Sequence, residues 1–217
     1  FASLPDRGDV VIFKHPVTGA DYVKRVIGLP GDTLALENGR VILNGAPLPK
    51  QPAGAADIAM GPNTACRSDG GVVVDGGPTC RYRQFRETLP SGKSYLTIDF
   101  GTVGPRFLSD GARGVATDER GNPLRIDPDN AAPIVVPEGQ LFVMGDNRDN
   151  SEDSRFWGVL PHDHIKGKAV VVYWSYDAMG PELAIDTGLG ATVRRLGSVF
   201  LHFFTRTRWE RMFQPVR

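Results

Sequence analysis

The sequence has little of several features that would narrow its function class. Its 217 residues include only two cysteines and four histidines, and 25 basic residues balance 25 acidic ones. Balanced charge gives no global field that favours nucleic acid, so we expect no such partner. No apolar run approaches the ~18 residues of a membrane-spanning helix, so we predict none in this stretch. The 26 glycines and 17 prolines instead favour a mainly β protein with many turns.

The most informative stretch is the polar loop at residues 145–155, Gly-Asp-Asn-Arg-Asp-Asn-Ser-Glu-Asp-Ser-Arg. It follows the apolar, strand-like segment Gln140–Met144. Asp, Asn and Ser side chains bond to nearby backbone groups and therefore form tight loops. A solvated connector is the plain alternative, but a simple turn needs only ~2–5 residues. Because sites tend to lie on polar loops carried by apolar strands, we interpret this loop as part of a site.

A second segment, residues 21–32, is predicted to be a strand that ends in a Pro-Gly turn. Alternation along a strand places Tyr22, Lys24 and Val26 on one face. A lysine on an edge strand extends its ammonium group into solvent, and this alternative stays open. If the side chain is desolvated instead, its pKa falls and the neutral amine can accept a proton.

Three segments together resemble ordered sequence boxes of bacterial type I signal peptidases. These segments are Arg7–Pro16, Tyr22–Asp32 and the 145–155 loop, with further likeness at Val136–Gly145 and Gly158–Pro161. The resemblance covers about residues 5–48 and 133–175. It implies a serine–lysine protease whose catalytic domain lies on the periplasmic face of the inner (cytoplasmic) membrane. Such enzymes remove signal peptides from exported preproteins and cleave after small residues.

The resemblance also implies a role for each residue of the motifs. Lys24 matches the family's general base, and Ser151 matches the serine whose hydroxyl orients that lysine. Asp153 and Arg155 match an ion pair that holds the loop against the site. The opening residues of the loop match positions to which we assign a structural role, namely Gly145, Asp146 and Asn147.

The nucleophile is the main departure from the family's pattern. In the family this serine lies in a Ser-Met-x-Pro box upstream of the first matching segment, and the present sequence contains no such box. Ser3 is the nearest serine, but its Ala-Ser-Leu-Pro context does not match. The family's oxyanion-hole donors belong to the same upstream segment. We therefore expect a fragment of a longer enzyme, inactive alone; a homologue that lacks the nucleophile is the alternative.

The expected fold is mainly β, with an antiparallel β-sheet catalytic core formed by residues 1–49 and 134–190. Residues 50–133 are rich in Gly, Asp and Pro and predict a smaller inserted β lobe. Its strand-like pieces are Gly71–Val74, Arg81–Phe85 and Ser94–Ile98. In the core, the apolar run Ala169–Trp174 predicts a buried strand.

The two cysteines, Cys66 and Cys80, both lie in the predicted inserted lobe. An even number of cysteines in an exported domain favours one disulfide bond, and a reduced buried pair is the alternative. A zinc site is disfavoured because two cysteines with distant histidines lack the usual ligand spacing. We expect neither a metal nor a cofactor.

The histidines provide no candidate for a Ser-His-Asp triad. His15 lies in a turn-like Lys-His-Pro context, and His202 lies in the C-terminal segment, where we expect it to face solvent or lipid headgroups. His162 and His164 flank an aspartate, but no third ligand is near them in the sequence. A polar turn is therefore favoured over a metal site.

The C-terminal segment, residues 191–217, combines basic and bulky apolar residues. It contains six arginines and one glutamate, a net charge of +5. Apolar residues follow helical spacing at Val193, Leu196, Phe200, Phe203 and Phe204. A basic amphipathic helix of this kind is typical of an interfacial membrane segment. A terminal helix packed on the protein's own core is an equal alternative.

The expected partners are the signal-peptide region of secreted preproteins and a lipid surface. An extended peptide binds by adding to a strand edge, with alternate side chains in pockets. Two other classes stay open. One is a self-cleaving serine–lysine regulator of the SOS-repressor kind, although neither its DNA-binding helix-turn-helix nor its cleavage loop is visible. The other is a binding module that keeps the peptide groove without a nucleophile.

Overall fold

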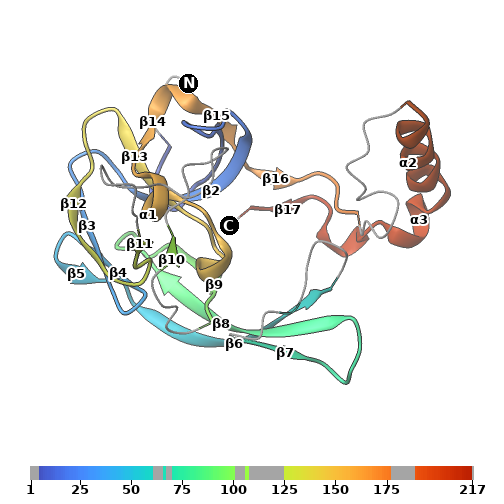
Figure 1. Cartoon of the computed structure of the whole chain (residues 1–217), viewed down its shortest axis with the longest axis horizontal. Helices are drawn as coiled ribbons and strands as arrows, with labels where there is room; N and C mark the ends of the chain where they lie inside the picture. The colour runs from blue at the N-terminus through green and yellow to red at the C-terminus, as the bar shows by residue number, and fades with distance from the viewer. Residues whose placement is uncertain are drawn as a thin grey trace. The chain divides into compact units, whose positions relative to one another are not determined.

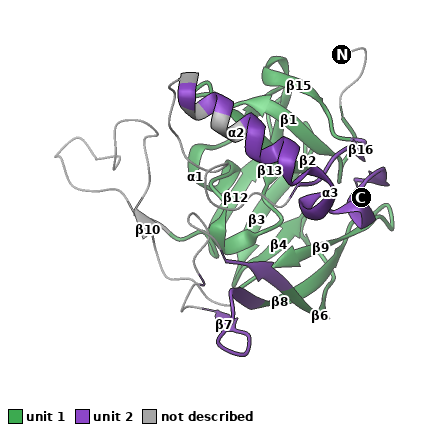
Figure 2. Ribbon diagram, turned by 90° about the vertical axis from the view of Figure 1, so that its right-hand side faces the viewer, with its two compact units in different colours: residues 1–56, 82–169, 217 green, residues 57–81, 170–216 purple. Residues whose placement is uncertain are grey.

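The structure is a computed structural model that describes residues 5–60, 66, 70–100, 106–107, 125–176 and 189–216. Antiparallel strands dominate it, so the predicted mainly β fold is confirmed (Figure 1). Two compact units divide the chain (Figure 2). Unit 1 comprises residues 1–56, 82–169 and 217, and unit 2 comprises residues 57–81 and 170–216. The division of the chain at residues 49, 133 and 190 stays a prediction.

A five-stranded sheet in unit 1 carries the predicted lysine. Its strand order is β14-β13-β2-β1-β15. The strands are β1 (Val10–Lys14), β2 (Asp21–Gly28), β13 (Gln140–Met144), β14 (Leu160–Pro161) and β15 (Ile165–Lys168). Lys24 on β2 pairs with Val11 on β1, while Arg25 pairs with Met144, the last residue of β13. Because β2 lies between β1 and β13, the loop that follows β13 begins beside Lys24.

Both faces of this sheet pack against apolar side chains. On one face Val26, Leu141 and Val143 join a core cluster with Val11, Phe13 and Leu160. On the other face Ile27, Phe142 and Met144 join a second cluster, which also contains residues of β3 and β4. Burial of each such side chain stabilises the fold by about 1.5–3 kcal/mol. Alternation along β2 and β13 thus fixes which way each side chain points.

The other strands of the fold form smaller sheets. One sheet has the order β12-β3-β4-β5 and another has the order β6-β8-β7, with β9 paired to β8. Their bounds are β3 (Thr33–Glu37), β4 (Arg40–Leu43), β5 (Ala46–Pro47), β6 (Lys50–Ala59), β7 (Gly71–Val73), β8 (Thr79–Thr88), β9 (Ser94–Ile98) and β12 (Ala131–Val135). A short pair joins β10 (Arg106–Phe107) and β11 (Arg125–Ile126). The strand-like pieces predicted near residues 71, 81 and 94 correspond to β7, β8 and β9.

The helical elements of the described residues are short except for one helix in unit 2, which has 13 residues. Unit 1 contains η1 (Arg148–Asn150), α1 (Ser154–Trp157) and η2 (His162–His164). Unit 2 contains α2 (Leu189–Leu201), α3 (Phe203–Arg206) and η4 (Trp209–Arg211), so the predicted C-terminal helical segment is confirmed. Unit 2 also contains the disulfide bond between Cys66 and Cys80, whose Cα atoms lie 5.3 Å apart. Within the described part of the chain, no helix is both long and apolar enough to span a bilayer.

The prediction of a buried strand over residues 169–174 is wrong. Only β16 (Val171–Val172) forms there, and it pairs with the two-residue strand β17 (Gln214–Pro215). Val170, Val171 and Tyr173 are exposed. A continuous apolar run indicates a tendency to be buried. A strand is buried only when other elements pack on both of its faces, and the two-residue pairing of β16 with β17 does not provide such packing.

Candidate active site

Lys24 and Ser151, which the sequence singles out, lie in direct contact. Lys24 Nζ donates a hydrogen bond to Ser151 Oγ over 2.9 Å, across 127 residues of sequence. The loop that carries Ser151 starts at Gly145, immediately after β13. A Cβ atom at Gly145 would overlap the Ser151 side chain and lie 3.6 Å from Lys24 Nζ. A residue without a side chain at position 145 therefore leaves the space in which the two groups meet.

The surroundings of Lys24 disfavour its charged form. The side chain is half-buried on an interior strand of the sheet, so it does not extend from a sheet edge into solvent. Burial lowers the pKa of the Lys24 amine; Asp153 opposes this shift, and the positive charge of Arg155 adds to it. The net direction is a lowered pKa. A lysine in this state has a larger neutral fraction at a given pH and can accept a proton.

Asp153 and Arg155 form a buried ion pair that closes the loop. Arg155 Nε and Nη2 donate to the two Asp153 carboxylate oxygens at 2.8 and 2.9 Å, and the two side chains are 2% and 0% exposed. Asp153 also accepts the Gly145 backbone N–H at 2.9 Å. Burial raises the pKa of Asp153, but Arg155 and these hydrogen bonds outweigh burial and hold the pKa below its usual value. The pair therefore ties the beginning of the loop to its end.

Further contacts connect the loop to the strands around it. Val143 N donates to Ser154 Oγ at 2.9 Å, and Arg155 Nη2 donates to the Arg148 carbonyl at 2.6 Å. On the other side, Ile98 N at the end of β9 donates to the Asp146 carbonyl at 2.8 Å. These bonds fix the backbone at both ends of the segment that presents Ser151.

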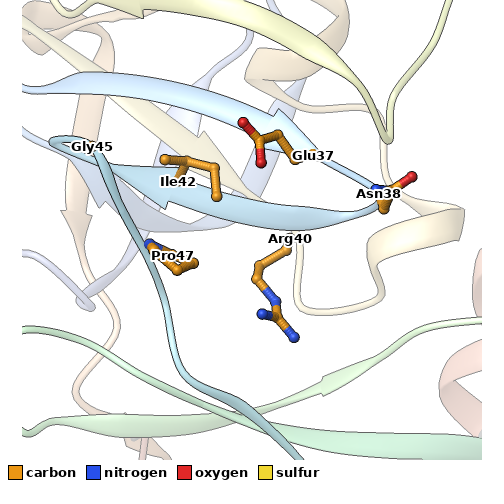
Figure 3. Close-up of a pocket in the computed structure, with 6 residues that line it drawn as sticks. All are labelled: Glu37, Asn38, Arg40, Ile42, Gly45 and Pro47. Atoms are coloured by element: carbon orange, nitrogen blue, oxygen red, sulfur yellow. The ribbon is translucent and has the colours of Figure 1, made fainter.

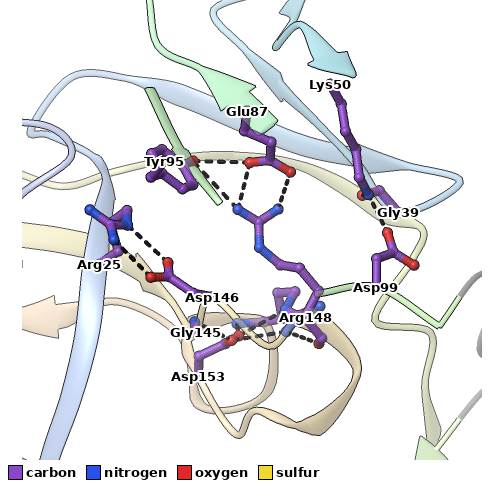
Figure 4. Close-up of polar contacts among 11 residues, drawn as sticks. Arg25, Gly39, Lys50, Glu87, Tyr95, Asp99, Gly145, Asp146, Arg148 and Asp153 are labelled. Carbon is purple, nitrogen blue, oxygen red and sulfur yellow. Dashed lines mark hydrogen bonds and ion pairs between the residues drawn. The ribbon is translucent and has the colours of Figure 1, made fainter. Parts of the chain in front are cut away.

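Arg25, the neighbour of Lys24 on β2, binds Asp146 at the opening of the loop (Figure 4). Its guanidinium donates to both carboxylate oxygens of Asp146 at 2.8 and 2.7 Å, and to the Gly8 carbonyl at 2.8 Å. The guanidinium carbon also lies 4.4 Å from the Tyr95 ring centroid, within the range of a cation–π contact. Asp146 thus has a specific partner, which the motif alone did not indicate.

A second buried ion pair, missed at the level of sequence, joins the loop to β8 (Figure 4). Arg148 donates to both oxygens of Glu87 at 2.7 and 2.6 Å, and Tyr95 donates its hydroxyl proton to Glu87 at 2.9 Å. The Arg148 and Glu87 side chains are almost completely buried. Local sequence carries no signal for this pair because 61 residues separate its members.

Other acidic side chains gather around Asp149 of the loop. The Phe100 backbone N–H donates to the Asp149 carboxylate, and the neighbouring Asp99 pairs with Lys50. Burial raises the pKa of Asp149 to about 6, and the nearby carboxylates of Asp99 and Asp129 add to the shift. A proton on Asp149 relieves repulsion among these carboxylates.

His15 is a buried residue beside the lysine strand that the sequence placed only in a turn. Its Nδ1 accepts the backbone N–H groups of Val17 and Thr18 at 3.2 and 3.1 Å, which leaves the ring proton on Nε2. The ring centroid lies 4.7 Å from that of Tyr22 and 5.1 Å from that of Trp157. Burial lowers the pKa of His15, so this ring is a neutral packing element next to the face that carries Lys24.

The other histidines lie in or beside short helical elements. His162 and His164 lie in the turn η2, and His164 Nδ1 is 3.0 Å from the Lys14 carbonyl oxygen. His202 lies between α2 and α3, with its Nδ1 3.0 Å from the Ser198 carbonyl oxygen. Among the residues that the structure describes, no group of three or more His, Cys, Asp or Glu side chains is placed to hold a metal ion.

The family model "Signal peptidase, peptidase S26" matches residues 2–174. The chain belongs to this signal peptidase family. The family resemblance inferred from the three sequence boxes is thereby confirmed. The matched range contains Lys24 and the whole 145–155 loop.

Individual relatives agree with this membership of the signal peptidase family. Signal peptidase I of Buchnera aphidicola subsp. Schizaphis graminum is 29% identical over 214 residues, which cover 91% of this chain and 62% of that protein. Signal peptidase I of Rickettsia typhi is 33% identical over 177 residues, which cover 81% of this chain and 54% of that protein. The chain thus spans 54–62% of the length of these two curated relatives.

A solved structure is also similar to this member of the family. A signal peptidase I from Enterococcus faecalis V583 is 22% identical, with a TM-score of 0.36. The alignment covers 76% of this chain and 97% of that chain.

A surface pocket of about 440 Å³ has a different set of lining residues (Figure 3). It is formed along β3, β4 and β5, and neither Lys24 nor any residue of the 145–155 loop lines it. Its lining residues are Glu37, Asn38, Arg40, Ile42, Gly45 and Pro47. The lysine–serine contact of this signal peptidase family member is therefore not part of that pocket.

Proposed function

We propose that this chain is part of a membrane-associated serine endopeptidase that removes signal peptides from exported preproteins by acyl transfer with a serine–lysine pair. The observation that carries the proposal is the 2.9 Å contact between Lys24 Nζ and Ser151 Oγ, at a lysine whose pKa burial lowers. Membership of the signal peptidase family supports the same reading. We place the catalytic region on the extracytoplasmic face of the inner membrane and the cleavage after small residues.

In the proposed mechanism, Lys24 acts as the general base in both half-reactions. The nucleophile is a serine of the Ser-Met-x-Pro box, which these 217 residues do not contain. Its oxygen attacks the scissile carbonyl carbon while the neutral Lys24 amine takes its proton. The resulting ammonium gives that proton to the departing amine, and the C–N bond breaks. Lys24 then takes a proton from the water that attacks the acyl-enzyme carbonyl carbon. The ammonium returns this proton to the serine oxygen as the ester C–O bond breaks, and the serine is restored.

Ser151 and the loop hold the lysine in place for these proton transfers. The Ser151 oxygen accepts a hydrogen bond from Lys24, which fixes the direction of the amine at the end of a flexible chain. The Asp153–Arg155 pair keeps Ser151 within reach because it closes the loop at Gly145. In this proposal Lys24 touches the reacting atoms, whereas Ser151, Asp153 and Arg155 are positioning residues.

The proposal is tested by incubating the complete gene product with a preprotein in detergent and measuring the product masses. We expect one cut after a small residue at the end of the signal peptide, and no cut when this residue is replaced by a bulky one. Binding without cleavage would contradict the peptidase proposal and favour a peptide-binding homologue. Cleavage of the gene product itself, with an intact preprotein, would favour a self-cleaving regulator.

A further inference from the structure

An exposed apolar stripe runs along the helices of unit 2. Val193, Leu196 and Phe200 on α2 and Phe204 on α3 are 62%, 65%, 83% and 79% exposed. Steps of three and four residues place the three α2 side chains on one face of the helix. Single exposed apolar residues are common on protein surfaces, but a continuous stripe of them marks a contact surface.

Aromatic rings extend this stripe beyond α2. Phe204 and Trp209 stack with their ring centroids 6.1 Å apart, and Phe203 meets both rings edge-on at 5.2 and 5.7 Å. Trp209 Nε1 donates to the Phe204 carbonyl at 3.1 Å. Phe204 and Trp209 remain exposed despite these contacts, and so does Phe213. The rings therefore hold one another in place while their outer faces are open to a partner.

Positive charge accompanies the apolar stripe. Residues 191–217 carry a net charge of +5, and Arg211 in η4 is exposed. Arginine pairs with phosphate groups through its planar fork of N–H donors. Exposed apolar side chains in a segment of net positive charge match the boundary between acyl chains and anionic headgroups.

The length of α2 suits a helix that lies on a membrane and is too short for one that crosses it. With 13 residues and a rise of about 1.5 Å per residue, α2 is about 20 Å long. The hydrocarbon core of a bilayer is about 30 Å thick. A helix of this length with one apolar face lies in the plane of the interface and inserts that face into the headgroup region.

We propose that the α2–α3 surface, defined as the exposed side chains of Val193, Leu196, Phe200, Phe204, Trp209 and Phe213, docks onto an anionic lipid bilayer. The occupant is a lipid surface because the charge of the segment complements anionic headgroups and the helix is too short to span. Membrane contact through this surface is separate from peptide cleavage. It concerns residues outside the Lys24 site, and it can be measured without any peptidase activity.

The test is flotation of the 217-residue chain with vesicles of phosphatidylglycerol and phosphatidylcholine. We expect the chain to float with these vesicles and to stay at the bottom of the gradient with phosphatidylcholine alone. Replacement of both Phe200 and Phe204 with serine should lower the partition coefficient about tenfold or more, because two large apolar side chains leave the contact. The matched control is Val17→Ser with Val72→Ser, at two exposed apolar positions outside the surface, and it should float like the unaltered chain.

Circular dichroism and thermal melting of each variant show whether it is folded, so a loss of flotation reports on the surface. Equal flotation of the Phe200/Phe204 variant and the unaltered chain would overturn the proposal. Absence of flotation with anionic vesicles would also overturn it. If sedimentation then showed self-association that only the Phe200/Phe204 variant loses, the surface would be a contact between two copies of the chain.

Discussion

Replacement of Lys24 with alanine in the complete gene product is expected to lower the turnover of a preprotein by about 10⁴-fold or more. Substrate binding should be retained. In the proposed mechanism this amine takes the serine proton in one half-reaction and the water proton in the other. No other lysine contacts Ser151 in the part of the chain that the structure describes. Single-turnover cleavage assays and equilibrium binding of the preprotein separate the two effects.

Two further variants show whether the effect is that of a base. Lys24→Arg keeps the positive charge, but a guanidinium stays protonated and cannot accept the serine proton, so it should be as inactive as the alanine variant. Lys166→Ala, on β15 of the same sheet, removes an exposed lysine paired with Asp21 and should leave turnover nearly unchanged. Wild-type turnover in Lys24→Ala would contradict the assignment. Activity restored by arginine would mean that charge, and not proton transfer, is the role of residue 24.

Replacement of Asp153 with alanine is expected to lower the free energy of unfolding by about 3–5 kcal/mol. The change leaves the Arg155 guanidinium buried without its carboxylate, and the Gly145 N–H loses its acceptor. Urea denaturation of the 217-residue chain at neutral pH measures the loss. Asp57→Ala is the matched control because Asp57 also binds an arginine through two oxygens, but at an exposed position, where such pairs contribute little.

The pH dependence of this loss has a defined sign. The folded-state pKa of Asp153 is lowered, so its stabilising contribution is complete above the unfolded pKa of ~3.9 and disappears as pH falls through the folded value. The difference in stability between the unaltered chain and Asp153→Ala should therefore narrow in acid. A loss no larger than that of Asp57→Ala at neutral pH would show that the pair does not hold the loop.

Local sequence pattern predicted the strands that carry the site. Gln140–Met144 and Ser94–Ile98 form strands β13 and β9 with the bounds that their composition indicated, because alternation and turn residues mark the ends of short strands. The Asp21–Gly28 strand and its alternating faces also follow from the sequence. The prediction of a buried strand at residues 169–174 was wrong because hydrophobicity indicates only a tendency to be buried. Actual burial depends on which strands become neighbours.

The sequence likewise predicted one part of the candidate site and missed another. Motif likeness identified Lys24 and Ser151, and the structure brings them to 2.9 Å. Motif likeness gave no indication that Glu87, in the predicted inserted lobe, binds Arg148 of the loop. It also did not indicate that His15 is buried against Tyr22. Such contacts join residues that are distant in sequence or face the interior. They are set by strand order and packing, which one sequence without aligned relatives does not reveal.

Burial lowers the pKa of the Lys24 amine, and the proposed mechanism needs this amine to be neutral when it accepts the serine proton. The most direct test is an NMR titration of the lysine side chains in the 217-residue chain, with the Lys24 signal assigned by its absence in Lys24→Arg. Lys24 should titrate below the ~10.4 of an unperturbed lysine, because burial lowers its pKa. If Lys24 instead titrated at the unperturbed value of ~10.4, its amine would stay charged at working pH, and its role as the general base would be contradicted.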